Sequence, residues 1–244
     1  MEPEPLAAEP HPQLSMVVPA FNEEAMLDTC IRMMSKTLRA LGKTHEIIVV
    51  DDGSRDHTGE IADRLAREVP CVLVHHQVNQ GTGGAFRTGV RASRGQYVVL
   101  WPVDMPCRIA DLKPFVGCLG KASVIVGCRH QRVGYNFLML INAWLYPHIV
   151  FYLFGLRLRD VNWICLYDGP ILRDVRLTQS GIPMLAEILV RLRDRGATFL
   201  EVDVEMTARE AGVPSAARPR VMWNTLLGLL QLWSAWRSEK ERAL

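Results

Sequence analysis

Residues 79–104, NQGTGGAFRTGVRASRGQYVVLWPVD, decide the fold of this 244-residue chain. The segment opens with a glycine-rich turn, continues with helical character and becomes an apolar strand over residues 96–101. A single carboxylate, Asp104, follows that strand. Open α/β sheets place polar chemistry in a crevice at the carboxyl ends of their strands. The segment therefore predicts an α/β sheet with Asp104 at its functional edge.

The chain before this segment alternates between strand and helix patterns. Strands are expected at residues 14–18, 46–51 and 71–74, and helices at residues 22–41 and 58–68. The second strand is apolar until its last residue, as a parallel strand covered on both faces should be. This alternation indicates βαβ units and a mostly parallel sheet.

The composition excludes several classes of protein. Apolar residues make up 49% of the chain and charged residues 22%, which is ordinary for a globular domain. A net charge of +2 lacks the basic bias of a dedicated nucleic-acid binder. The six cysteines have no CxxC spacing, which favours free thiols in a reducing compartment over disulfides or zinc. Residues 1–12 carry no apolar signal-peptide region and are expected to form a disordered tail.

Four motifs follow one another along the chain: VVPAFNEE (17–24), EIIVVDDGSRDHT (46–58), NQGTGGAFRTGVRASRG (79–95) and the strand before Asp104. Together they resemble the family-2 glycosyltransferases of GT-A type, and among them the polyprenyl-phosphate sugar transferases similar to dolichyl-phosphate mannose synthase. Each motif alone is weak, so the resemblance depends on their order and spacing. It implies one Rossmann-like α/β domain over residues 13–244. Residues 13–130 would bind the nucleotide, and residues 131–244 the acceptor.

The resemblance implies a nucleotide-sugar site at the ends of the first two strands and at the glycine-rich turn. Asp52 is expected to accept hydrogen bonds from a nucleobase N–H or from ribose hydroxyls. Glycines allow close backbone approach, and the start of the next helix favours an anion. The other expected contacts are Pro19, Ala20, Phe21, Glu23, Gly53, Gly81, Gly83, Arg87, Asp104 and Arg209. The competing interpretation gives Asp51 and Asp52 a role in turn formation only, and Arg87 a place on a solvated helix face.

Asp104 is the expected metal ligand. Relatives place an Asp-x-Asp pair here, which holds a divalent metal against the leaving diphosphate. In this chain Pro102 and Pro106 occupy the positions of expected ligands. One carboxylate still suffices for Mg²⁺ or Mn²⁺ when donor phosphates and water complete the coordination. The alternatives are weak metal dependence and an inactive site.

The second half of the chain supplies the remaining expected catalytic residues. Arg129 follows a predicted strand at residues 123–127 and stands where relatives have a phosphate-facing arginine. Asp160 stands where relatives have an acid, although the following residues depart from their pattern. Glu187, on a predicted helix at residues 182–195, also matches an acid of the relatives. Ordinary surface or capping roles are the competing interpretation for all three.

Two apolar segments are expected to touch a membrane surface or a second copy of the chain. Residues 133–156 nominally reach the length of a bilayer span, but Pro147 is expected to break a helix midway. Interfacial amphipathic helices are therefore favoured. The predicted last helix, residues 221–237, carries Trp223, Trp233 and Trp236 beside arginines, which also suits an interface. A core or oligomer helix, or a membrane-anchoring partner, is the alternative.

The sequence thus predicts an inverting transferase that moves a sugar from a GDP- or UDP-linked donor to a polyprenyl phosphate, peripherally at the cytoplasmic membrane face. A phosphate acceptor is already anionic and needs no strong base, so positioning and charge stabilisation would carry catalysis. One alternative is transfer to a hydroxyl of a soluble acceptor, with Asp160 or Glu187 as the required base. Another is a non-catalytic module that binds a nucleotide or a partner.

Overall fold

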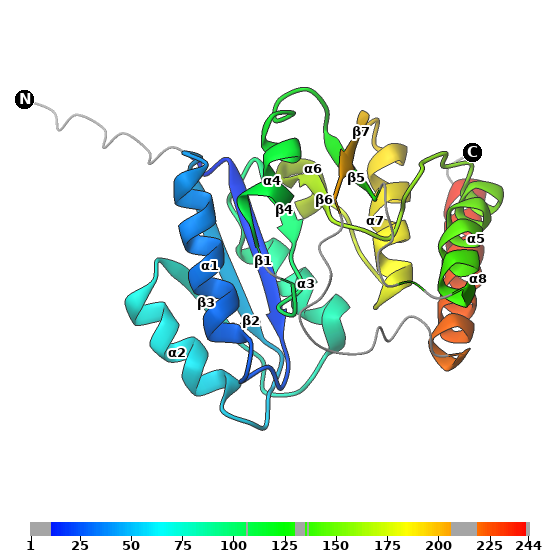
Figure 1. Cartoon of the computed structure of the whole chain (residues 1–244). Helices are drawn as coiled ribbons and strands as arrows, with labels where there is room; N and C mark the ends of the chain where they lie inside the picture. The colour runs from blue at the N-terminus through cyan, green and yellow to red at the C-terminus, as the bar shows by residue number, and fades with distance from the viewer. Residues whose placement is uncertain (1–10, 106, 130–134, 136, 206–218, 243–244) are drawn as a thin grey trace, which may run out of the picture.

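The computed structural model describes residues 11–105, 107–129, 135, 137–205 and 219–242. Within these ranges seven strands form one sheet, in the order β3-β2-β1-β4-β6-β5-β7 (Figure 1). The strands are β1 (Leu14–Ala20), β2 (His45–Asp51), β3 (Cys71–His75), β4 (Tyr97–Leu100), β5 (Val124–Arg129), β6 (Cys165–Asp168) and β7 (Phe199–Val204). β6 is antiparallel to β4 and β5, and the other neighbours are parallel. The mostly parallel α/β sheet predicted from the alternation is confirmed.

Helices cover both faces of this sheet. They are α1 (Leu27–Ala40), α2 (Thr58–Glu68), α3 (Gly81–Ala92), α4 (Ile109–Val116), α5 (Phe137–Phe154), α6 (Gly169–Arg173), α7 (Ile182–Asp194) and α8 (Pro219–Arg242). Successive strand residues face opposite sides, so Val17 joins one buried cluster and Met16 the other. The first cluster includes α3 and α7, and the second includes α1, α2 and α4. Two apolar layers therefore hold the strands from either side.

The register of the first three strands positions the candidate site. Ala20 pairs with Asp51, and Asp51 pairs with His75. All three strands therefore end at the same level of the sheet. The loops that follow them emerge together at one edge, as the parallel topology requires.

The end of β1 differs from the sequence-based prediction. Pro19 lies inside the strand instead of ending it. β4 pairs with β1 only as far as Val17, so the missing N–H of Pro19 lies beyond that ladder. Asn22 does not begin a helix, because it adopts a left-handed backbone with φ of 55° and α1 starts only at Leu27. Residues 22–26 are therefore free to form a loop at the site.

The expectation that Pro147 breaks a helix was wrong. It lies inside α5, which is continuous from Phe137 to Phe154. The neighbouring residues Tyr146 and Val150 are buried in the core, and the Tyr146 hydroxyl donates to the carbonyl of Ile182 at 3.2 Å. This packing on both sides of the proline offsets the lost helical hydrogen bond. No helix in the described ranges is both long and apolar enough to cross a bilayer.

Candidate active site

The loops after β1 and β2 are joined by hydrogen bonds. The backbone N–H of Asp52 donates to the carbonyl of Ala20 at 2.8 Å. The N–H of Asn22 donates to the Ser54 hydroxyl at 3.1 Å, and the N–H of Glu23 to the Thr58 hydroxyl at 2.7 Å. The structure therefore brings together the expected nucleotide contacts of both strand ends: Pro19, Ala20, Phe21, Glu23, Asp52 and Gly53. Phe21 leaves 40% of its surface exposed at this edge.

The glycine-rich turn is attached to the same loops. The backbone N–H of Gln80, just before α3, donates to Asp52 Oδ1 at 2.9 Å. Gly53 has φ of 71°, and a β-carbon there would lie 2.9 Å from the backbone nitrogen of Asn79. Glycine is thus required at residue 53 for the two loops to touch. The start of α3 is thereby fixed beside the strand ends, and the N–H of its first residue, Gly81, donates to Asn79 Oδ1 at 3.0 Å.

The glycines of the turn also have roles within the protein itself. Gly81 needs glycine for its φ of 74°, whereas nothing crowds its side-chain position. A β-carbon on Gly83 would lie 2.7 Å from the carbonyl oxygen of Gln179 and 2.6 Å from the Ser180 hydroxyl. Arg87 Nη1 also donates to the Gln179 carbonyl, at 3.2 Å. Close packing against residues 179–180 therefore explains why residue 83 is a glycine. One nitrogen of the Arg87 guanidinium is already engaged in a hydrogen bond within the protein.

Asp104 lies on a tight turn at the end of β4. The N–H of Met105 donates to the Pro102 carbonyl at 3.2 Å, and the indole of buried Trp101 donates to the Met105 carbonyl at 3.1 Å. Asp104 itself remains partly exposed. Burial raises the pKa of the Glu23 carboxyl, and the negative charges of Asp104 and Asp56 raise it further. Glu23 and Asp104 thus share a region of negative potential.

The side chains of this region could hold a divalent cation only if a bound molecule or water supplied further ligands. In the part of the chain that the structure describes, no three His, Cys, Asp or Glu side chains are grouped to hold a metal ion. A hard divalent cation at Asp104 would need oxygen ligands from bound phosphates and water. Pro106 and Arg209, both singled out from the sequence, lie outside the described residues, as do residues 1–10 of the expected tail.

Arg129 and Asp160 bind each other. Arg129 Nε donates to Asp160 Oδ2 at 2.7 Å and Nη2 donates to Oδ1 at 2.9 Å, with both side chains buried. Nη1 donates to the Tyr135 hydroxyl at 2.9 Å, and the guanidinium lies 4.6 Å from the ring centre of Trp163. Tyr135 and Trp163 were not identified from the sequence, since nothing in their spacing marks them. The structure brings these two expected site residues together as a bidentate pair, a contact that the sequence did not predict.

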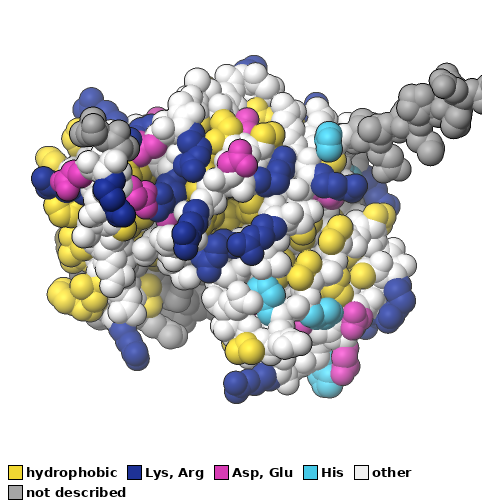
Figure 2. Space-filling model, turned by 180° about the vertical axis from the view of Figure 1, so that it is seen from behind, with side chains coloured by type: hydrophobic (Ala, Val, Ile, Leu, Met, Phe, Trp, Pro, Cys, Tyr) yellow, Lys and Arg dark blue, Asp and Glu magenta, His cyan; other side chains and the backbone are white. Residues whose placement is uncertain are grey.

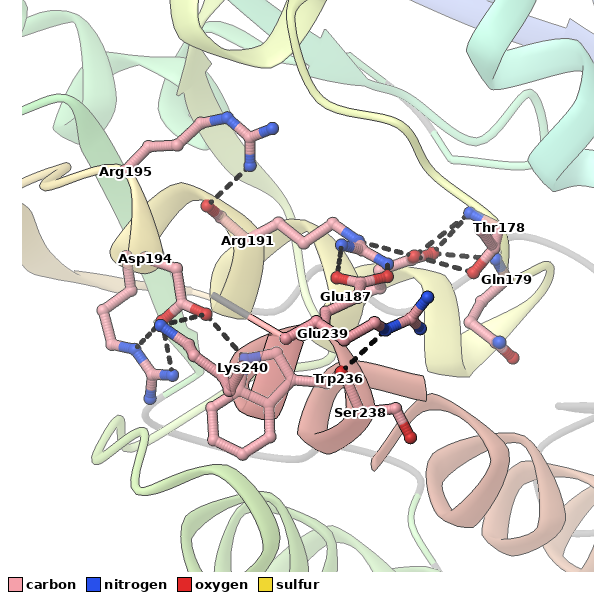
Figure 3. Close-up of polar contacts among 12 residues, drawn as sticks. Thr178, Gln179, Glu187, Arg191, Asp194, Arg195, Trp236, Ser238, Glu239 and Lys240 are labelled. Atoms are coloured by element: carbon pink, nitrogen blue, oxygen red, sulfur yellow. Dashed lines mark hydrogen bonds and ion pairs between the residues drawn. The ribbon is translucent and has the colours of Figure 1, made fainter. Parts of the chain in front are cut away.

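Glu187 is also fully engaged, contrary to a solvated role. It is completely buried and accepts hydrogen bonds from Thr178 N and Oγ1, from Gln179 N and from Arg191 Nε, at 2.7–3.1 Å (Figure 3). Arg191 Nη1 in turn donates to Glu239 Oε2 of α8 at 2.9 Å. The carboxylate thereby fixes the Thr178–Gln179 backbone that contacts Gly83 and Arg87.

The cationic side chains of the protein are unevenly placed. Seen from behind, Lys and Arg side chains gather over the middle of one face, with histidines below them (Figure 2). Such a concentration creates a positive potential that the small net charge does not reveal. It suits a phosphate-bearing ligand on that face.

The first prediction concerns the Arg129–Asp160 pair. Asp160→Ala should lower the free energy of unfolding by about 3–5 kcal/mol, because it leaves a buried guanidinium without its counterion. The double variant Arg129→Met/Asp160→Leu should regain most of this loss, because it removes both charges. Urea denaturation of the single and double variants measures the difference. A double variant as unstable as Asp160→Ala would contradict the interpretation.

The second prediction concerns Glu187. Glu187→Ala should cost about 3–5 kcal/mol of unfolding free energy, since it removes the buried counterion of Arg191 and the shared acceptor of the Thr178 and Gln179 N–H groups. Glu239→Gln is the matched control, and it should cost less than about 1 kcal/mol because Glu239 is half-exposed. Chemical denaturation of both variants checks the ranking. Equal losses would show that the network depends on α8 rather than on the buried carboxylate.

Comparisons with known proteins agree with this architecture. Residues 15–174 match glycosyl transferase family 2. The chain is 35% identical over 134 residues to dolichyl-phosphate beta-glucosyltransferase ALG5A of Trichomonas vaginalis, covering 49% of this chain and 41% of the relative. It is 36% identical over 115 residues to the human dolichyl-phosphate beta-glucosyltransferase, covering 43% of this chain and 35% of the relative. The chain thus spans less than half the length of these two relatives.

A third relative and a solved structure extend the comparison. Dodecaprenyl-phosphate galacturonate synthase of Rhizobium johnstonii is 28% identical over 170 residues, covering 68% of this chain and 50% of the relative. Glucosyl-3-phosphoglycerate synthase of Mycobacterium tuberculosis superposes with a TM-score of 0.71 at 20% identity, covering 91% of this chain and 80% of that one. The GT-A type of α/β fold implied by the sequence motifs is confirmed. The chain belongs to glycosyl transferase family 2.

Proposed function

We propose that this chain transfers a sugar, with inversion, from a GDP- or UDP-linked donor to a polyprenyl phosphate. The observation that carries the proposal is the joining of both strand-end loops to the glycine-rich start of α3 through Asp52. This arrangement places carboxylate acceptors for a nucleoside next to a helix start that favours phosphates. The names of the dolichyl-phosphate and dodecaprenyl-phosphate relatives support the acceptor class.

In this proposal residues 13–244 act as one domain, with the nucleotide-sugar contacts named from the sequence. Asp104 holds Mg²⁺ or Mn²⁺ together with donor phosphates, beside the negative field that it shares with Glu23. Support comes from the mycobacterial synthase, which was crystallised with Mn²⁺ and UDP. The metal, when bound, would neutralise the departing diphosphate. Arg87 and Arg209 are assigned to the diphosphate, and Arg129 and Asp160 to the acceptor side.

The alternative with a hydroxyl acceptor has less support. It needs a carboxylate that takes a proton from the acceptor. Asp160 holds the Arg129 guanidinium with both oxygens, and Glu187 is buried under protein donors. A phosphate acceptor requires no such base, so the engaged state of both carboxylates favours it.

The same proposal places the reaction at a membrane surface on the cytoplasmic side. α5 and α8 lie beside each other at one end of the molecule (Figure 1). Their exposed apolar side chains are Phe137, Leu140, Ile141, Trp144, Leu145, Phe151, Tyr152, Trp223, Leu227 and Leu230. Such a surface suits interfacial insertion. Six free cysteines support a reducing compartment. A second copy of the chain, or an anchoring partner, is the competing occupant of this surface.

The donor is tested by thermal shift with UDP, GDP and their sugars, with and without Mn²⁺. One nucleotide should raise the melting temperature, consistent with about 2.7 kcal/mol of stabilisation at a concentration 100 times its Kd. Asp104→Asn should lose the Mn²⁺-dependent part of the shift and most of the transfer activity. Asp174→Asn, an exposed carboxylate on another loop, is the control. Unchanged Mn²⁺ dependence in Asp104→Asn would exclude it as the metal ligand.

Membrane contact is tested by co-sedimentation with vesicles containing anionic lipid. Trp144→Ala/Trp223→Ala should weaken binding roughly 10-fold or more, because two large apolar side chains no longer insert. Trp236 is not a suitable probe, since it packs against Phe154 and its indole donates to Asp194. Ile109→Ala, an exposed apolar residue on α4, is the control. Binding that survives in the double variant would remove α5 and α8 from the membrane contact.

A further inference from the structure

His76, directly after β3, is a buried histidine that the proposed chemistry does not use. Its side chain is 7% exposed, and both ring nitrogens have partners. Nδ1 lies 2.7 Å from Asp52 Oδ1, and Nε2 lies 2.9 Å from the Thr88 hydroxyl of α3. Its backbone N–H donates to the Asp51 carbonyl at 2.8 Å. The ring is therefore held between the end of β2 and the helix that follows the glycine-rich turn.

The hydrogen bonds are complete without an extra proton on the ring. An ionised Asp52 accepts only, so Nδ1 carries the hydrogen and donates to Oδ1. Nε2 of that neutral ring is then an acceptor for the Thr88 O–H. The ring thus links a fixed carboxylate to α3 with defined donor and acceptor directions.

Asp52 is bound through one oxygen. Oδ1 accepts from His76 and also from the backbone N–H of Gln80 at 2.9 Å. Oδ2 has no hydrogen bond to any residue that the structure describes, and no fully buried side-chain oxygen among those residues lacks a partner. Oδ2 therefore keeps contact with solvent although the side chain is only 4% exposed. Asp52 Oδ2 is therefore an available hydrogen-bond acceptor at the edge of the sheet where the strands end.

We propose that His76 is the positioning residue for this carboxylate. It fixes Oδ1 of Asp52, so that Oδ2 accepts an N–H from the base of the bound nucleoside diphosphate. The inference rests on the proposed nucleotide-sugar function and deepens it, because it names a residue outside the four motifs that controls base recognition. A histidine that turns and fixes a carboxylate acts through that carboxylate and touches no ligand itself.

The preceding residue supplies a matched control. His75 contacts Asp51 Oδ2 at 2.9 Å and Asp63 at 3.3 Å, so it makes the same kind of pair one residue earlier. Successive residues of a strand face opposite sides, and His75 is 41% exposed. Asp51 Oδ1 is taken by the N–H of Ser54 at 3.1 Å. The His75–Asp51 pair therefore shapes the turn and presents no comparable acceptor.

The test uses the full chain and calorimetric titration with UDP, GDP and inorganic pyrophosphate, all with Mn²⁺. His76→Phe should weaken binding of the preferred nucleotide roughly 10- to 100-fold, the usual effect of removing a hydrogen bond to a charged group. His76→Asn keeps a donor near Nδ1 and should stay within about 5-fold. His75→Asn should stay within about 2-fold. Pyrophosphate has no base, so its affinity should be the same in all variants.

Each contrary result has a distinct meaning. Equal weakening of nucleotide and pyrophosphate in His76→Phe would reduce His76 to a structural support of the turn. Unchanged nucleotide affinity would overturn its role altogether. If His76→Phe does not fold, Thr88→Val removes the Nε2 partner alone and should weaken the nucleotide but not pyrophosphate; no change would again overturn the proposal. A wild-type chain that binds pyrophosphate but neither nucleotide would refute the proposed function itself.

Discussion

The parallel register of β1, β2 and β3 is the constraint on which the candidate site depends. It ends three strands at one level, so their loops must satisfy their backbone groups next to one another. They do so mutually: Asp52 N–H donates to the Ala20 carbonyl, and His76 N–H to the Asp51 carbonyl. Because these bonds link neighbouring loops, none of the three loops can move without disturbing the others. The site is therefore a property of the sheet edge rather than of any one loop.

In the part of the chain after β4, buried ion pairs link neighbouring segments. Arg129 and Asp160 join the end of β5 to the segment before β6. Glu187 and Arg191 lie one turn apart on α7, and together they tie that helix to the Thr178–Gln179 backbone and to Glu239 of α8. Burying such charges carries a large desolvation cost, which is offset only when the remaining hydrogen-bond positions are filled. In both cases they are filled. Such pairs specify geometry more than they add stability. Through the Thr178–Gln179 backbone, the second pair reaches the start of α3 and so connects the two halves of the molecule.

The strands and the strand-end acids could be predicted from the sequence because burial on two faces produces apolar runs, and parallel topology fixes where those runs end. Contacts between residues distant in the chain could not be predicted in this way. Nothing near Asp160 indicates that it binds Arg129, which precedes it by 31 residues. Gly83 resembles a phosphate-binding glycine, yet Gln179 occupies the space beside it. Trp236 has the neighbours of an interfacial residue but packs inward, and Pro147 is tolerated because core contacts flank it. In each case tertiary packing overrode a local pattern.

The turn at Asp104 holds a single carboxylate at the place where the family resemblance implies an acidic pair. Pro102 has no N–H to contribute, and its carbonyl accepts from Met105, whose own carbonyl is held by the indole of Trp101. Val103 and Met105 are buried on either side, so the carboxylate between them has little freedom. Burial raises the pKa of the Glu23 carboxyl, and the nearby negative charge of Asp104 raises it further. A diphosphate brought to this place would add repulsion unless a cation lay between them. In the proposed function, this negative charge favours binding of the diphosphate donor together with a divalent cation.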